Sequence, residues 1–115
     1  MKLNLSGYVT PTTSYGLVLL NLLNEFTKNG IECSLFPTGV REDDCGIFSD
    51  VVNKAITNSI LFDDKAPSLR VAHQFDLATR IGKGQAFGYT FFEMNHLTPF
   101  EKRHIDSVDK LFVVS

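Results

Sequence analysis

Short apolar runs rich in β-branched and aromatic residues alternate along this chain with segments whose apolar positions recur at helical spacing. The apolar runs span residues 3–9, 31–36, 69–73, 87–92 and 110–114. Strands that alternate with helices form parallel sheets, because the helix carries the chain back to the same end of the sheet. The pattern therefore predicts an α/β fold. We expect a three-layer Rossmann-like open sheet of about five mainly parallel strands, with helices on both faces and the strand order 3-2-1-4-5.

Three segments between these runs are predicted to be helical. The first covers residues 17–28 and ends at Asn29-Gly30, a stop signal. The second follows from apolar residues at helical spacing, namely Phe48, Val51, Val52, Ala55 and Ile56. The third begins at Thr98 and Pro99 and runs through Asp106, because a Thr cap followed by Pro starts helices. Residues 76–84 are expected to form a helical turn followed by a Gly-Lys-Gly turn.

Composition limits the class of protein but does not identify it. The 115 residues form one expected domain, 1–115, with 43% hydrophobic and 21% charged residues. A net charge of −2 gives no general attraction to nucleic acid, so none is expected as a partner. The sequence carries neither a signal peptide nor an apolar run of about 20 residues, which favours a cytoplasmic location. Cys33 and Cys45 are therefore expected to be reduced, structural thiols.

The first predicted loop, from Ser6-Gly7 to Ser14-Tyr15-Gly16, joins a strand to a helix. Backbone N–H groups at such a helix start suit phosphate or sugar oxygens, although a plain connection is the alternative. The loop has neither the G-x-G-x-x-G fingerprint of dinucleotide-binding folds nor the Gly-Lys-Ser/Thr of a phosphate-binding loop. Gly82, Gly84 and Gly88 precede a strand instead of a helix, so they are taken as a turn. No cofactor is expected.

Polar residues also follow two predicted strands at their carboxyl ends, where α/β sheets hold ligands. His73 could donate a hydrogen bond to a ligand hydroxyl or act as an acid or base, or it could be a half-buried histidine bonded to a carbonyl. Glu93 could be a base, a hydroxyl acceptor, a loop cap or a solvated carboxylate. Asn95 and His96 follow the same predicted strand, 87–92, as Glu93 does. No metal is expected, because His73, Glu93 and His96 match no metal-ligand spacing.

The loop Ser14-Tyr15-Gly16, the strand ending in His73 and the segment GYTFFEMNHLTPFEKRHIDSVDKLFVVS together resemble the N-terminal domain of glycosyltransferases of the two-domain GT-B architecture, group 1. That family transfers a sugar from a nucleotide-sugar donor to a sugar, lipid or protein acceptor, and its N-terminal domain mostly binds the acceptor. The resemblance implies that Tyr15 and Gly16 lie in the loop that approaches the donor phosphates and the acceptor. It further implies that His73 orients the reacting sugar and that Glu93 holds the acidic position of the motif. Ser14 and Asn95 are the other expected substrate contacts.

The sequence departs from that family in two respects. Its first loop has one glycine where many members have two or more, and the donor-binding domain with its paired glutamates is absent. We therefore expect no transfer by this chain alone, with the donor half supplied by a longer reading frame or by a second subunit. The apolar surface that a missing covering domain would leave exposed predicts dimerisation. The alternatives are a stand-alone Rossmann-like interaction module without catalysis and, third, a small flavodoxin-like or nucleotide-binding protein.

Overall fold

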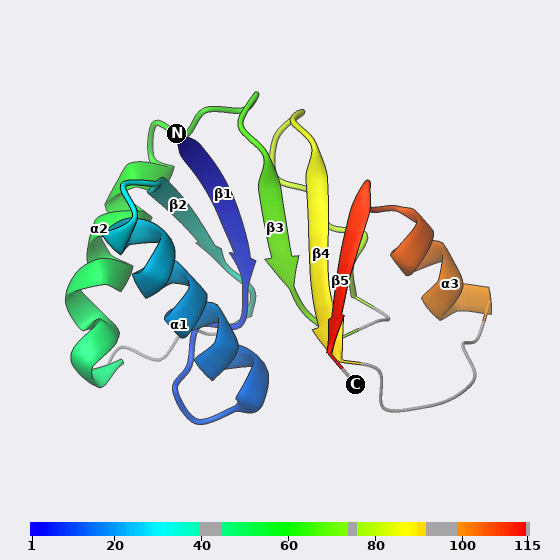
Figure 1. The fold of residues 1–115 in the computed structure, drawn as a ribbon, viewed down its shortest axis with the longest axis horizontal. Coiled ribbons are helices and arrows are strands. Elements are labelled where there is room, and N and C mark those ends of the chain that lie inside the picture. Colours follow the sequence, from blue (N-terminus) through cyan, green and yellow to red (C-terminus); the bar gives the residue numbers. More distant parts are fainter. Residues whose placement is uncertain (40–44, 74–75, 92–98, 115) are drawn as a thin grey trace.

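The computed structural model describes residues 1–39, 45–73, 76–91 and 99–114. Within them lie the strands β1 (Lys2–Gly7), β2 (Glu32–Pro37), β3 (Ser68–Val71), β4 (Ala86–Phe91) and β5 (Lys110–Val114), the helices α1 (Ser14–Lys28), α2 (Ser49–Ser59) and α3 (Pro99–Asp106), and the short 3-10 helix η1 (Gly46–Phe48). The strands form a single parallel sheet (Figure 1). The predicted α/β class and the open Rossmann-like sheet are confirmed.

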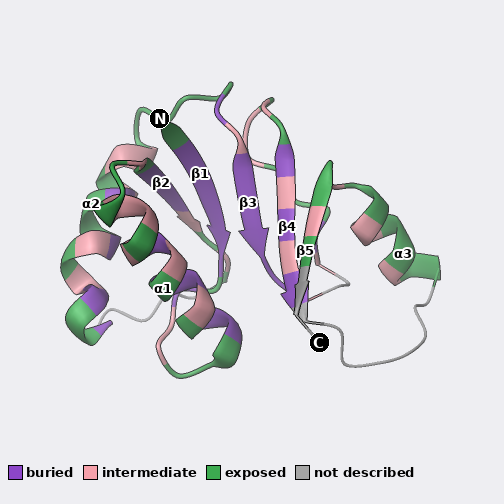
Figure 2. Cartoon of the chain, in the orientation of Figure 1, coloured by how far each residue is buried: buried purple, intermediate pink, exposed green. Residues whose placement is uncertain are grey.

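The strand order is β2-β1-β3-β4-β5, so the predicted order 3-2-1-4-5 is wrong. β3 pairs directly with β1, with Leu5 opposite Leu69 and Gly7 opposite Val71. Both strands are buried along nearly all of their length (Figure 2), whereas both end residues of β2 are exposed at the edge of the sheet. Apolar patterning shows that a strand is buried but not which strand it pairs with, which explains the error.

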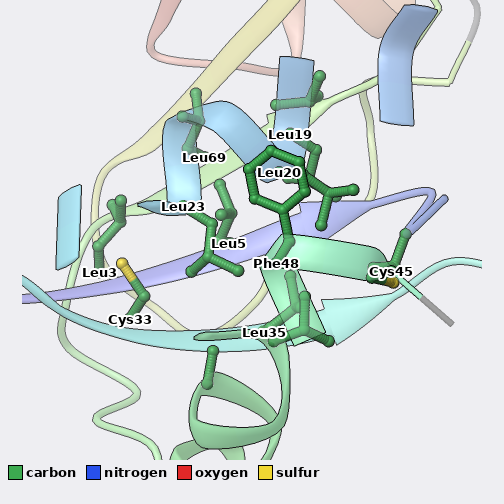
Figure 3. Packing of buried hydrophobic residues seen from close by; sticks show 14 of the residues in the cluster. Leu3, Leu5, Leu19, Leu20, Leu23, Cys33, Leu35, Cys45, Phe48 and Leu69 are labelled. Atoms are coloured by element: carbon green, nitrogen blue, oxygen red, sulfur yellow. The ribbon is translucent and has the colours of Figure 1, made fainter. Parts of the chain in front are cut away.

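One face of the sheet packs against α1 and α2 and forms the core of the protein (Figure 3). Alternate strand residues point into this core, because side chains along a strand alternate between its two faces. The cluster includes Leu3, Leu5, Cys33, Leu35, Leu69 and Val71 from the strands, Leu19, Leu20 and Leu23 from α1, and Phe48, Val52 and Ala55 from the η1–α2 segment. The predicted helical spacings therefore identify the buried faces of both helices.

α1 begins three residues before the predicted start at position 17. The side chain of Thr13 accepts a hydrogen bond from the backbone N–H of Gly16 at 3.1 Å. The backbone carbonyl of Thr13 accepts another from Leu17 at 2.9 Å. A threonine cap of this kind satisfies donors that the helix itself cannot pair, so the helix starts at Ser14.

On the opposite face of the sheet, Leu77 of the segment 76–85 lies over β4, and α3 contacts this segment. The predicted helical turn at 76–84 is wrong, because this segment is irregular in the structure. Nδ1 of His104 in α3 accepts the backbone N–H groups of Leu77 and Ala78, both at 3.2 Å. Leu77 in turn lies over Gly88 of β4, 3.3 Å from the position that a Cβ atom would take. Contacts between elements distant in sequence hold this segment, and local helical spacing could not reveal them.

Candidate functional site: a cleft at the carboxyl edge of the sheet

A cleft of about 320 Å³ opens at the carboxyl edge of the sheet, where parallel α/β sheets bind their ligands. Its lining residues are Tyr8, Thr13, Ser14, Tyr15 and His73. Tyr8 directly follows β1, and His73 lies two residues beyond β3. The other three come from the cap and first turn of α1, whose start lies at this edge (Figure 1). The structure thus brings together three residues that the sequence singled out: Ser14, Tyr15 and His73.

The rings of Tyr15 and His73 pack against each other in the cleft. Their centroids are 4.2 Å apart, and the ring planes are inclined by 55°. The Tyr15 hydroxyl lies 3.4 Å from the hydroxyl of Thr90 at the end of β4, and Tyr15 itself is buried. His73 is only partly buried, so its imidazole remains accessible to a ligand. The partly exposed ring of His73 lies beside hydroxyl groups that can exchange hydrogen bonds, a combination that suits small polar ligands with apolar faces.

Ser14 and Tyr15 in the first turn of α1 also line the cleft. The first N–H groups of a helix lack partners within the helix and carry the positive end of its dipole. The first turn of α1, all of which is described, holds no acidic side chain that would neutralise this end. The geometry therefore favours an anionic or hydroxyl-rich ligand near Ser14 and Tyr15.

Gly16 lies behind the cleft and is not one of its lining residues. A Cβ atom at this position would overlap the backbone carbonyl of Thr10 and would lie 2.9 Å from the Thr13 hydroxyl. Close packing therefore explains the glycine at position 16, because a residue without a side chain lets the loop before α1 lie directly on the helix. The predicted approach of Gly16 to a ligand stays a prediction.

Glu93 and Asn95, the other predicted site residues, lie outside the described residues, as does His96. Among the residues that the structure describes, no group of three His, Cys, Asp or Glu side chains is arranged to hold a metal ion. No helix in the same described ranges is long and apolar enough to cross a membrane.

Sequence analysis did not single out Arg70, which is bonded to Asp76, whose backbone N–H in turn donates to the carbonyl of the cleft residue His73. Arg70 lies within β3 with only 5% of its surface exposed, and its guanidinium pairs with the Asp76 carboxylate at 3.0 Å. A buried cation is rare unless it is paired, so a charge inside an otherwise apolar strand was the available signal. The run Leu69-Arg70-Val71 carries that signal.

Neither a family model, nor a curated protein, nor a solved structure matches this chain. The resemblance to glycosyltransferases therefore rests on the loop Ser14-Tyr15-Gly16, on His73 and on the segment 88–115, and it stays a prediction. The physical arrangement of the cleft is the basis for a function.

The two cysteines are buried and not bonded to each other. Burial raises the pKa of the Cys33 thiol to about 11, and a side-chain hydrogen bond with Thr27 opposes that shift in part. A thiol with a raised pKa is a poor nucleophile at neutral pH. Cys33 therefore has the properties of a structural residue.

The raised pKa of Cys33 predicts a loss of stability in alkali. Between pH 9 and 11 the thiol ionises in the unfolded chain but stays protonated in the folded one, so rising pH favours unfolding. The protonated thiol makes its full contribution to the free energy of unfolding below pH 9, and roughly 2–3 kcal/mol of that free energy is lost by pH 11. Urea unfolding of the wild type and of Cys33→Ala at several pH values measures it, because the variant lacks this contribution. Parallel stability curves for the two proteins above pH 9 would contradict the assignment.

Proposed function

We propose that this chain binds the sugar-bearing acceptor of a glycosyltransferase in the cleft at the carboxyl edge of its sheet. The observation that carries the proposal is the Tyr15–His73 ring pair beside the start of α1. An aromatic face packs against the C–H face of a sugar ring, and polar groups next to it fix the sugar hydroxyls. The fold supports the proposal, because Rossmann-like sheets bind ligands at this edge.

In this proposal each group of the cleft has a distinct role. The imidazole of His73 exchanges hydrogen bonds with a sugar hydroxyl and orients it for reaction. The positive end of the α1 dipole, at Ser14, attracts sugar or phosphate oxygens. Glu93 and Asn95 remain the proposed acidic group and substrate contact that the resemblance implies.

Sugar transfer in this proposal requires a nucleotide-sugar donor held by a second Rossmann-like unit, in the same protein or in a second subunit. Transfer needs both substrates fixed together in a site that excludes water. A domain that holds only the acceptor binds it without accelerating the reaction. We therefore expect no multiple turnover of a nucleotide-sugar by residues 1–115 alone.

The substitution His73→Ala tests the proposed site. We expect the chain to bind glucose weakly, as a probe of the acceptor sugar, and His73→Ala to reduce that binding by about tenfold, the effect of losing one to two hydrogen bonds. NMR titrations with glucose, UDP-glucose and inorganic phosphate measure the affinity and locate the binding residues. Asn21→Ala is the control, because Asn21 is an exposed residue of α1 that does not line the cleft. Wild-type affinity in a folded His73→Ala variant would contradict the proposal.

A second candidate function is an interaction module without catalysis that pairs with a second copy of itself. The supporting observation is an apolar groove of about 190 Å³ at the amino end of the sheet, lined by Met1, Leu3, Phe26, Ile31, Pro67, Leu69, Phe87 and Phe112. Phe112 belongs to β5, the last strand of the sheet, and is 45% exposed. The same NMR titrations separate the candidates, since a module of this kind would bind none of the three probes in the cleft.

A further inference from the structure

One buried guanidinium connects three segments that meet at the carboxyl edge of the sheet. Arg70 of β3 points to the side of the sheet away from the core cluster and uses all three of its nitrogens. Nε donates to the backbone carbonyl of Asp76 at 2.6 Å, and Nη2 donates to the Asp76 carboxylate at 3.0 Å. Nη1 donates to the hydroxyls of Thr38 at 3.1 Å and of Ser6 at 3.4 Å.

The contacts with Asp76 hold a residue that is bonded to His73. The backbone N–H of Asp76 donates to the carbonyl of His73 at 2.9 Å, so the two residues are linked directly. Arg70 binds both the carbonyl and the carboxylate of Asp76. The position of the His73 backbone, and with it the approach of the imidazole to Tyr15, therefore depends on the guanidinium.

The contact with Thr38 holds the residues that follow β2, next to Tyr8. The backbone N–H of Thr38 donates to the carbonyl of Gly7 at 2.8 Å, which ties the end of β2 to the end of β1. The next residue, Gly39, faces the ring of Tyr8, whose Cε1 atom lies 3.6 Å from the position of a Cβ atom. Tyr8 and His73 both line the cleft, so Arg70 is connected to two of its walls.

We infer that Arg70 is a positioning residue that sets the distance between His73 and Tyr15 and so pre-forms the cleft. Its role in ligand binding rests on the proposed function, whereas its effect on His73 does not. Arginine suits this task because its planar group presents donors in fixed directions, whereas lysine has a single nitrogen on a flexible stem. Pre-formed sites bind more tightly because less ordering is needed on binding.

The substitution Arg70→Lys tests this inference with a measurement that needs no ligand. The ring current of Tyr15 shifts the imidazole proton signals of His73, because the two rings are 4.2 Å apart. We expect Arg70→Lys to move these signals toward the values of an unpacked histidine, and to weaken binding of glucose by about tenfold or more. Asp76→Asn keeps an oxygen acceptor and the backbone carbonyl, so its His73 signals should stay near those of the wild type.

Arg80→Lys is the matched control, because Arg80 pairs with Asp109 at 3.5 Å on an exposed part of the surface. Its His73 signals and its affinity should not change. A folded Arg70→Lys protein with wild-type His73 signals would overturn the inference. If Arg70→Lys does not fold, Asp76→Ala makes the same test, since it removes the contact with the Asp76 carboxylate and leaves the arginine in place. Displaced His73 signals in a protein whose wild type binds none of the probes would support the positioning role and reject the proposed function.

Discussion

Leu19→Ala is expected to lower the free energy of unfolding by about 3–4 kcal/mol, close to the middle of the range for buried leucines. Leu19 is fully buried in the cluster between α1 and the sheet. Its Cδ2 atom also lies 3.4 Å from the Cβ position of Gly7 at the end of β1. The loss combines the transfer of the removed carbons to water with the cavity that remains, because the surrounding strands cannot close around it.

Leu17→Ala provides the matched control for this prediction. The same substitution is made in the same helix, but Leu17 is 42% exposed and lies outside the core cluster. We expect a loss below about 1 kcal/mol, as for most surface substitutions. Urea unfolding followed by circular dichroism measures both variants. Equal losses at the two positions would mean that α1 does not pack as the structure describes.

Gly16→Ala is expected to destabilise the protein by roughly 2–4 kcal/mol, although alanine is normally favoured over glycine within a helix by about 1 kcal/mol. The new methyl group would overlap the backbone carbonyl of Thr10, and a backbone atom cannot rotate away as a side chain can. The loop before α1 must therefore separate from the helix. That movement would also disturb the hydrogen bond from Gly16 to the cap residue Thr13, which lines the cleft.

Gly30→Ala separates this steric effect from the general cost of replacing a glycine. No atom lies within 4 Å of the Cβ position of Gly30, but its φ angle of +80° disfavours other residues. We expect a loss of about 1–2 kcal/mol from the backbone conformation alone. Thermal unfolding of the two variants gives the comparison, and NMR spectra show whether the residues of the cleft move. A Gly16→Ala protein as stable as the wild type would contradict the close packing of the loop.

The sequence pattern predicted the elements of the fold well because their signals are local. The apolar spacing in residues 17–28 identified the buried face of α1, and Pro99 marked the start of α3. The stop at Asn29-Gly30 was also confirmed. Hydrophobic periodicity and capping depend on neighbours within a few residues, so a single sequence contains them.

The candidate site was predicted only in part. Ser14, Tyr15 and His73 line one cleft, because the ends of parallel strands and the helix start share an edge of the sheet. Tyr8 and Thr13 were not predicted as lining residues, since a tyrosine after a strand and a threonine cap are common without a site. Arg70 was missed for another reason: its partners Ser6 and Thr38 are 64 and 32 residues away in the chain.

The sequence by itself determined the class of fold and the faces that its helices bury, because these follow from local spacing of apolar residues. Only the tertiary structure decided that β3 pairs with β1, that Tyr15 packs against His73, and that a buried arginine connects the two sides of the cleft. These contacts join residues far apart in the chain, and they form only when the strands pair in the folded protein. The spacing of apolar residues shows that each strand is buried, but it does not specify which strands pair.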